Sequence, residues 1–255
     1  ASISGGGDSR ILEVAKGAKA TVKGLTLTGG YGWELAGAVL NNGDLTLDHV
    51  TVTKNSVTTG GIDFWKGGAG IYSGEGSTLR LVDSTISDNT VTGGAGGGIY
   101  SFFGTTTTIE RSTISGNTVN DVGGGLRLLG NASITNSTVS GNATTGWHGG
   151  GIFQTDGTLT LTHTTVTGNT SPGGTAAGLF VGTFGASGAK IEYAASVVAG
   201  NSGEQCFLAP FGSGPVAFTS LGGSLVGDGT CAPVAADRVV ADALLGPLAD
   251  NGGPT

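Results

Sequence analysis

The hexapeptide Ser84-Thr85-Ile86-Ser87-Asp88-Asn89 recurs along most of the chain and decides its fold. Copies of it occupy residues 50–55, 112–117, 137–142, 164–169 and 196–201. The last residue of all six segments is asparagine, and these asparagines lie 34, 28, 25, 27 and 32 residues apart. Self-similarity in this range predicts stacked repeats, in which each unit buries its apolar face against its neighbours.

Two further apolar positions repeat in step with the hexapeptide. Its third residue is apolar, as in Ile86 and Ile114, and another apolar residue lies five positions earlier, as in Leu81 and Ile109. A third apolar position follows each asparagine in a glycine-rich segment such as Gly98-Ile99-Tyr100. Strand side chains alternate between faces, so the odd spacing requires a turn between the first two positions, where the residues are mostly polar. Each repeat therefore predicts three short strands and three turns.

Three strands in about 27 residues make one coil of a parallel β-helix, whose strands pair with their equivalents above and below at about 4.8 Å. We predict an all-β solenoid of about seven such coils over residues 1–201. The irregular segment 202–255 is predicted to cap its end, because an uncovered end coil exposes unpaired backbone groups and favours end-to-end or lateral self-association.

The repeated asparagines are predicted to form an internal ladder, in which each side-chain amide hydrogen-bonds to the next. Its members are Asn55, Asn89, Asn117, Asn142, Asn169 and Asn201. N-glycosylation is the alternative, since four asparagines fit the acceptor motif N-x-[ST]: Asn131, Asn136, Asn142 and Asn169. Asn142 and Asn169 belong to both sets, and for these two we favour the ladder, because their positions face the interior.

Cys206 and Cys231 both lie in the C-terminal segment. A disulfide between them would close a loop of about 25 residues and stabilise the fold by about 3 kcal/mol. A zinc site is not predicted, because neither a histidine near them nor a second cysteine pair is present. Paired cysteines indicate an exported protein.

Composition excludes other classes of protein. The net charge is −7, and no run of like charges provides the basic stripe that nucleic acids require. No apolar run approaches the roughly 20 residues of a membrane span. We therefore expect neither a nucleic-acid partner nor a membrane span in this segment.

The repeated GGGI…LTLTxSTVSGN pattern resembles the right-handed parallel β-helix repeats of large bacterial surface proteins, and is similar to polymorphic outer-membrane protein repeats. The two cysteines and the final sequence LGPLADNGGPT resemble a choice-of-anchor Q domain. The first likeness covers about residues 18–201 and the second 202–255. Together they imply a single-stranded, right-handed parallel β-helix in a bacterial protein that is extracellular or located at the cell surface. These families define no catalytic residues to carry over.

An enzyme on this scaffold would act on polysaccharide, as a lyase or glycoside hydrolase, and would need two or three neighbouring carboxylates or a calcium cage. The best candidates are one row of turn residues and two acids beside it: His49, Asp83, Arg111, Asn136 and His163, with Asp48 and Glu110. No two acids share the row itself, so a solvated turn with a surface ion pair is favoured. We predict no catalytic residue, no metal site and no cofactor.

Binding is better supported than catalysis. Trp33, Trp65 and Trp147 all lie in the variable segments between the asparagine and the glycine-rich strand, where loop insertions build binding faces. The outward rank of that strand is rich in aromatic residues: Leu40, Tyr72, Tyr100, Arg127, Phe153 and Phe180. Either the loops cover this stripe, or a sugar or partner protein stacks on it. We predict a non-catalytic structural or adhesive protein that binds carbohydrate or a surface protein along its loop edge.

The outward residues of the hexapeptide strand form two ranks of hydroxyls, such as Thr51/Thr53 and Thr85/Ser87. They resemble the Thr-x-Thr arrays of ice-binding solenoids, which is a second alternative function. The ordinary explanation is the preference of threonine for strands on a solvated face.

Overall fold

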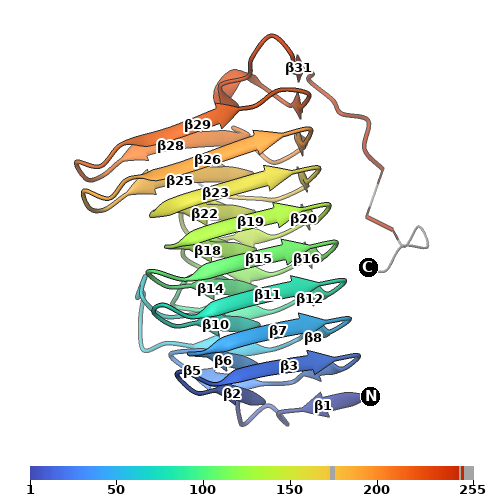
Figure 1. Ribbon diagram of the computed structural model, residues 1–255, viewed down its shortest axis with the longest axis vertical. Coiled ribbons are helices and arrows are strands. Elements are labelled where there is room, and N and C mark those ends of the chain that lie inside the picture. Colours follow the sequence, from blue (N-terminus) through green and yellow to red (C-terminus); the bar gives the residue numbers. More distant parts are fainter. Residues whose placement is uncertain (173–175, 247, 250–255) are drawn as a thin grey trace.

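The computed structural model describes residues 1–172, 176–246 and 248–249. These residues stack in a column of parallel coils, with the N-terminus at one end and the cap at the other (Figure 1). The predicted β-helix is confirmed. In the described part of the chain, three large sheets run the length of the column, and each contains one of the predicted strands.

The hexapeptide sheet contains the strands of the recurring motif. Its members, in order, are β1 (Ser2–Ser4), β4 (Thr26–Thr28), β8 (Thr51–Thr53), β12 (Thr85–Ser87), β16 (Thr113–Ser115), β20 (Thr138–Ser140), β24 (Thr165–Thr167), β27 (Val197–Val198), β30 (Leu225–Val226) and β31 (Arg238–Val239). Ile86 pairs in register with Val52 on one side and Ile114 on the other. Equivalent side chains therefore stack in columns along the axis.

The glycine sheet contains the glycine-rich strands. They are β2 (Leu12–Val14), β6 (Val39–Asn41), β10 (Ile71–Ser73), β14 (Ile99–Ser101), β18 (Leu126–Leu128), β22 (Ile152–Gln154), β25 (Leu179–Thr183) and β28 (Cys206–Pro210). The last two strands are longer than the others, and the loops that follow them reach beyond the column (Figure 1).

The long-strand sheet closes the third side. It consists of β3 (Lys19–Lys23), β7 (Asp44–Asp48), β11 (Thr78–Val82), β15 (Thr106–Glu110), β19 (Asn131–Thr135), β23 (Gly157–Thr162), β26 (Ala189–Ala194) and β29 (Val216–Ser220). The inward residues of the three sheets form one continuous aliphatic core, which includes Leu81, Ile99 and Ile114.

A fourth sheet corrects the prediction of three strands per coil. It consists of β5 (Tyr31–Trp33), β9 (Ser56–Thr58), β13 (Thr90–Thr92), β17 (Thr118–Val119) and β21 (Ala143–Thr144). Most of these strands directly follow a ladder asparagine, and they bury Val57, Val91 and Val119 in a small separate cluster. Sequence reasoning missed these strands because it assigned the residues after each asparagine to a variable segment. Thr90-Val91-Thr92 nevertheless has the same polar–apolar–polar pattern as the three-residue strands of the hexapeptide sheet.

The corner between the long-strand and hexapeptide sheets has the same backbone conformation in successive coils. His49, Asp83, Arg111, Asn136 and His163 all have left-handed φ angles, between 45° and 55°. This single left-handed residue provides the turn that the odd spacing required. Gly24 takes the same position in an earlier coil, with φ 61°.

The asparagine ladder is confirmed. Asn89 Nδ2 donates to Asn117 Oδ1 at 2.9 Å, and that same oxygen also accepts from the backbone N–H of Asn89 at 3.1 Å. The remaining Nδ2 proton goes to a strand carbonyl, as in Asn117 Nδ2 to Ile86 O at 2.9 Å. The pattern continues from Asn55 to Asn201, and Asn142 and Asn169 are fully buried within it.

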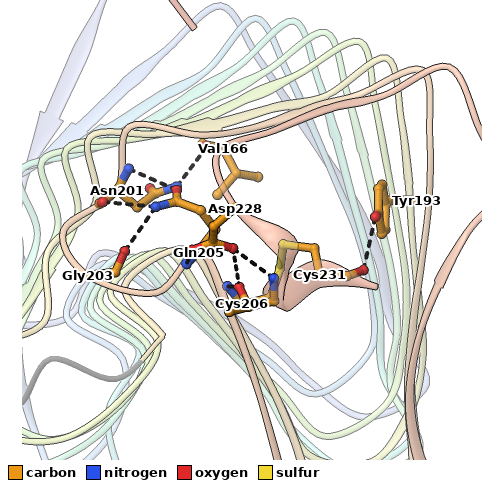
Figure 2. The surroundings of a disulfide bond; sticks show 9 residues. Val166, Tyr193, Asn201, Gly203, Gln205, Cys206, Asp228 and Cys231 are labelled. Carbon is orange, nitrogen blue, oxygen red and sulfur yellow. Dashed lines mark hydrogen bonds between the residues drawn. A yellow bond between two sulfur atoms is a disulfide. The ribbon is translucent and has the colours of Figure 1, made fainter. Parts of the chain in front are cut away.

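The last rung of the ladder is Gln205, which sequence reasoning did not identify. Asn201 Nδ2 donates to Gln205 Oε1 at 2.9 Å, and Gln205 Nε2 turns back to the carbonyls of Asn201 and Gly203 (Figure 2). A second ladder was also missed. The hydroxyl of the first hexapeptide residue accepts a hydrogen bond from the backbone N–H of the equivalent residue in the preceding coil. Ser84 N–H, for example, donates to Ser112 Oγ at 3.1 Å.

The segment after residue 201 contributes a further coil before it covers the end of the helix. Strands β28, β29 and β30 extend the three large sheets, and β31 adds a last strand to the hexapeptide sheet. The predicted disulfide joins Cys206 on β28 to Cys231 in a short 3₁₀ helix, η1 (Gly229–Cys231), and both cysteines lie in the main core (Figure 2). Residues 247 and 250–255 of the predicted cap lie outside the described residues.

Removal of the disulfide is expected to loosen this end of the helix. In a Cys206→Ala/Cys231→Ala variant, the loss of a 25-residue constraint should destabilise the cap by about 3 kcal/mol. Hydrogen exchange should therefore accelerate in β28 and η1, while β8 and β12 exchange at the wild-type rate. Unchanged exchange in the cap would show that the sheets alone hold it.

Candidate functional site

The aromatic rank of the glycine sheet forms one column in the structure. Tyr72, Tyr100, Arg127 and Phe153 pair in register from coil to coil, and Phe180 and Phe207 continue the column. Of the six predicted members of this rank, Leu40 is partly buried and the other five are buried, with 0% of Arg127 exposed. Of the two alternatives left open by the sequence, the covered stripe is therefore the one observed. Tyr72, Tyr100, Arg127 and Phe153 do not form an open platform for a ligand.

Two loops at the edge of the glycine sheet cover this column. Residues 59–70 lie over its first part, where the Tyr100 hydroxyl donates to the Phe64 carbonyl at 2.9 Å and Trp65 packs on Phe103 with ring centroids 5.7 Å apart. Residues 145–151 lie over its second part. Their backbone is fixed by a hydrogen bond from Trp147 N–H to the Asp121 carbonyl at 3.0 Å.

The three tryptophans remain at the surface of this edge. Trp33, at the end of β5, is 60% exposed, Trp65 is 46% exposed and Trp147 is 54% exposed. They come from separate coils, and Trp65 and Trp147 belong to the two covering loops. The structure thus separates the predicted binding residues into exposed tryptophans and a buried column beneath them.

A cavity of about 200 Å³ lies between the covering loops and the end of the column. Its lining residues are Phe64, Val122, Arg127, Trp147, His148, Phe153, Phe184 and Phe211. It brings together Arg127, Trp147 and Phe153 from the predicted set, but not Trp33, Trp65, Tyr72 or Tyr100.

Sequence reasoning missed the phenylalanines that close the cavity. Phe184 and Phe211 lie just beyond the long strands β25 and β28, with ring centroids 5.6 Å apart. A signal for them exists in the sequence, because each lies four residues after a member of the aromatic column, Phe180 or Phe207, and each is followed by glycine. Phe64 and His148 come from loops that carry no repeat pattern.

The guanidinium of Arg127 lies against the walls of this cavity. Its Cζ is 4.6 Å from the ring centroid of Phe153 and 5.9 Å from that of Phe184, and its Nη1 donates to Thr155 Oγ1 at 2.9 Å. Among the described residues, its Nε and Nη2 find no hydrogen-bond acceptor. Burial lowers the pKa of Arg127, because a charged group loses its hydration there.

Asp121 is a second buried charged residue near Arg127. It is 0% exposed, and within the described part of the chain neither carboxylate oxygen has a hydrogen-bond donor. Burial raises the pKa of Asp121 to about 7, although the charge of Arg127 partly opposes the rise. The same burial raises the pKa of Tyr100, beside Arg127, to about 12. Buried polar groups without partners are rare in folded proteins and call for an explanation.

Residues 11–202 match the protein family described as "Right handed beta helix region". The chain belongs to this family. Searches of curated proteins and of solved structures give no match. The right-handed fold that the family resemblance implied is thereby confirmed, and a right-handed β-helix with a disulfide is compatible with an extracellular protein. Within the described residues, no helix has the length and apolar character needed to cross a membrane.

The turn row of this right-handed β-helix holds a network of ion pairs. The side-chain atoms of Asp48, His49 and Asp83 that could bind a metal ion lie within 4.8 Å of one another. Lys23 Nζ lies 2.9 Å from Asp48, and this contact lowers the carboxyl's pKa. Arg111 Nε and Nη2 donate to the two oxygens of Asp83 at 2.7 and 2.9 Å, which lowers the pKa of Asp83. Each carboxylate is thus ionised and already paired with a cation at the surface.

The hydroxyl ranks of the hexapeptide sheet do not form one uncovered flat surface along the whole right-handed β-helix. Residues 242–246 and 248–249 run beside the later coils (Figure 1). Together with Thr138, Thr165 and Thr167 they line a groove of about 1000 Å³. In earlier coils the hydroxyls bond to one another, as in Ser87 Oγ to Thr53 Oγ1 at 3.1 Å.

Proposed function

We propose that the protein is a secreted or cell-surface β-helix of bacterial type, with a structural and adhesive role, that binds carbohydrate through the tryptophans of its loop edge without catalysing a reaction. The observation that carries this proposal is the exposure of Trp33, Trp65 and Trp147 on one edge. Large aromatic side chains that a soluble protein leaves exposed together mark an interaction site. Indole rings suit sugars, whose C–H faces stack on aromatic planes.

The scaffold supports this role. The covering loops are held by hydrogen bonds and packing, so their tryptophans, Trp65 and Trp147, have little conformational entropy to lose on binding. Lys66, next to Trp65, pairs with Glu34 Oε1 at 2.6 Å and with Asp63 at 3.3 Å, which ties the loop to the preceding coil. The stacked coils provide a rigid support for such loops.

A glycan array tests the proposal. We expect the wild-type protein to bind a defined set of glycans, and each of Trp33→Ala, Trp65→Ala and Trp147→Ala to weaken binding about 3- to 10-fold, the loss of one aromatic contact. Leu221→Ala is the matched control, because Leu221 is 62% exposed in the C-terminal segment.

Equal binding by wild type and all three tryptophan variants would contradict the proposal. Release of reducing or unsaturated sugars from uronic-acid polymers would instead support the alternative of a polysaccharide-degrading enzyme. A surface protein captured through the same tryptophans would replace carbohydrate as the ligand.

A further inference from the structure

Two loops near the C-terminal end of the glycine sheet project from the column (Figure 1). Residues 184–188 connect β25 to β26, and residues 211–215 connect β28 to β29; we call them the protruding loops. Paired residues are 27 positions apart between β22 and β25 but 32 apart between β23 and β26, so the first loop has five residues that the preceding coil lacks. In the next coil the spacing is 27 in both sheets, so the second loop has the same length as the first.

The protruding loops are neutral, although the molecule as a whole is acidic. Residues 164–189 and 205–227 contain no Asp, Glu, Lys, Arg or His, in a chain whose net charge is −7. These two stretches include both loops and the strands that lead into them. One charge from the preceding coil touches the first loop, where Ser187 Oγ donates to Asp156 Oδ2 at 3.1 Å.

Large apolar side chains are exposed on this projection. Phe184 is 51% exposed, Phe211 is 57% exposed, and Leu208 on β28 is 43% exposed. The two phenylalanine rings stack on each other, with 5.6 Å between their centroids and 9° between their planes. Apolar side chains that gather in this way on a protein surface mark an interaction site.

Hydrogen bonds fix the protruding loops to one another. The last two residues of β25 pair with the last two of β28, and Gly214 N–H donates to the Gly185 carbonyl at 2.9 Å. Thr183 Oγ1 also bonds to both the N–H and the carbonyl of Gly185 at 3.2 Å. These bonds satisfy backbone groups that would be costly to leave unpaired in a medium without water.

The cavity of about 200 Å³ borders the same projection, since Phe184 and Phe211 both line it. Six of its eight lining residues are Phe, Trp or Val. The guanidinium of Arg127 is fully buried behind this wall and presents no charge to the opening. Apolar cavities of this kind do not hold ordered water. Methylene groups could fill it without requiring a hydrogen bond.

The size and shape of the projection favour a lipid surface over a protein as its partner. A stable protein interface takes about 20–30 residues from each side, whereas the protruding loops have five residues each. A bilayer needs no complementary shape, because projecting Phe and Leu side chains are accommodated at the boundary between headgroups and acyl chains.

We propose that the protruding loops insert into the surface of a zwitterionic phospholipid bilayer, with Phe184, Phe211 and Leu208 at the level where the acyl chains begin. The loops offer no cation to an anionic lipid, and the net charge of −7 opposes approach to an anionic surface. Binding through so few side chains is reversible. This inference is independent of sugar binding at the exposed tryptophans, although Trp147 borders both surfaces.

Vesicle co-sedimentation tests the choice of lipid. We expect the wild-type protein to bind phosphatidylcholine vesicles, and to bind phosphatidylglycerol vesicles about threefold or more weakly at low ionic strength. The difference should shrink as salt screens the charge of the protein. Absence of binding to phosphatidylcholine, or tighter binding to phosphatidylglycerol, would overturn the proposal.

Substitutions then assign the binding to the protruding loops. Phe184→Ser/Phe211→Ser should weaken binding to phosphatidylcholine vesicles about tenfold or more, because two buried rings are lost. Leu221→Ser is the matched control, since Leu221 is 62% exposed outside these loops. Equal vesicle binding by the double variant and wild type would contradict the assignment. The double variant should keep the glycan binding of wild type, so the two proposals fail separately.

A spectroscopic measurement covers the case in which the double variant does not fold. In Phe184→Trp the new indole lies at the tip of the first protruding loop. Its addition of phosphatidylcholine vesicles should shift the tryptophan emission to shorter wavelength by more than in wild type, because the indole leaves water. An equal shift in the two proteins would place the loop outside the bilayer and overturn the proposal.

Discussion

Replacement of Asn117 with alanine is expected to destabilise the β-helix by about 3 kcal/mol or more. Asn117 Oδ1 accepts from the backbone N–H and from Nδ2 of Asn89, and its own Nδ2 donates to the Ile86 carbonyl and to Asn142 Oδ1. Alanine leaves the two Asn89 donors and the Ile86 carbonyl without those partners in a site closed to water. Each buried group left unsatisfied costs about 1–3 kcal/mol.

Asn136→Gly is the matched control for this prediction. Asn136 is an exposed asparagine at a left-handed corner, with φ 50°, where glycine is readily accommodated. Denaturant unfolding followed by circular dichroism should show a large loss of stability for Asn117→Ala and little change for Asn136→Gly. Similar stabilities for the two variants would mean that the ladder follows from coil stacking and adds little to it.

The stability of the protein is expected to fall as the pH rises from about 4 to about 7, by up to roughly 4 kcal/mol from Asp121 alone. The pKa of Asp121 is about 7 in the folded state, against 3.8 for an unperturbed aspartate. Between these values the folded protein keeps the proton and the unfolded chain releases it, so the unfolded state binds fewer protons. The stabilisation is therefore complete below pH 3.8 and is lost as the pH rises through 7.

Other groups contribute differently. Arg127 and Asp63 are the charged residues that act on Asp121, and Arg127 limits the rise of its pKa. Asp48 and Asp83 have lowered pKa values, so their contribution increases with pH and is lost only in acid, below the window of Asp121. The two effects are thus separated by pH.

The measurement is the unfolding midpoint at several pH values for wild type and Asp121→Asn. Asparagine carries no titrating proton, so the fall between pH 4 and pH 7 should largely disappear in this variant. Asp8→Asn, at an exposed turn, should retain the wild-type profile. Parallel profiles for wild type and Asp121→Asn would contradict the buried, protonated carboxyl.

Most of the fold could be predicted because a β-helix repeats its contacts. The spacing of Ile86, Ile114 and Val139 places them in one column, and the asparagines that follow each must then also stack. The hidden short-strand sheet shows the limit of that reasoning. Val91 and Val119 lie in the segments between the asparagine and the glycine-rich strand, which differ in length between coils and therefore resemble loops, even though short strands such as Thr90–Thr92 lie within them.

The candidate site was predictable only in part. The sequence placed Tyr100, Arg127 and Phe153 on the outer face of one strand rank, but the register alone does not determine whether loops cover that face. The covering depends on how residues 59–70 and 145–151 fold back, and these segments differ in length and composition between coils. The cavity arises where such loops meet Phe184 and Phe211 from later coils, so no single repeat contains it.

The asparagine ladder has a direction, because each amide donates toward the C-terminal neighbour and accepts from the N-terminal one. Only Gln205 departs from this rule, since its longer side chain folds its amide back onto its own coil. Whole coils duplicated or deleted upstream would leave that terminator in place. The number of coils can thus change by tandem duplication during evolution, or by engineering, without a new residue being needed to end the ladder.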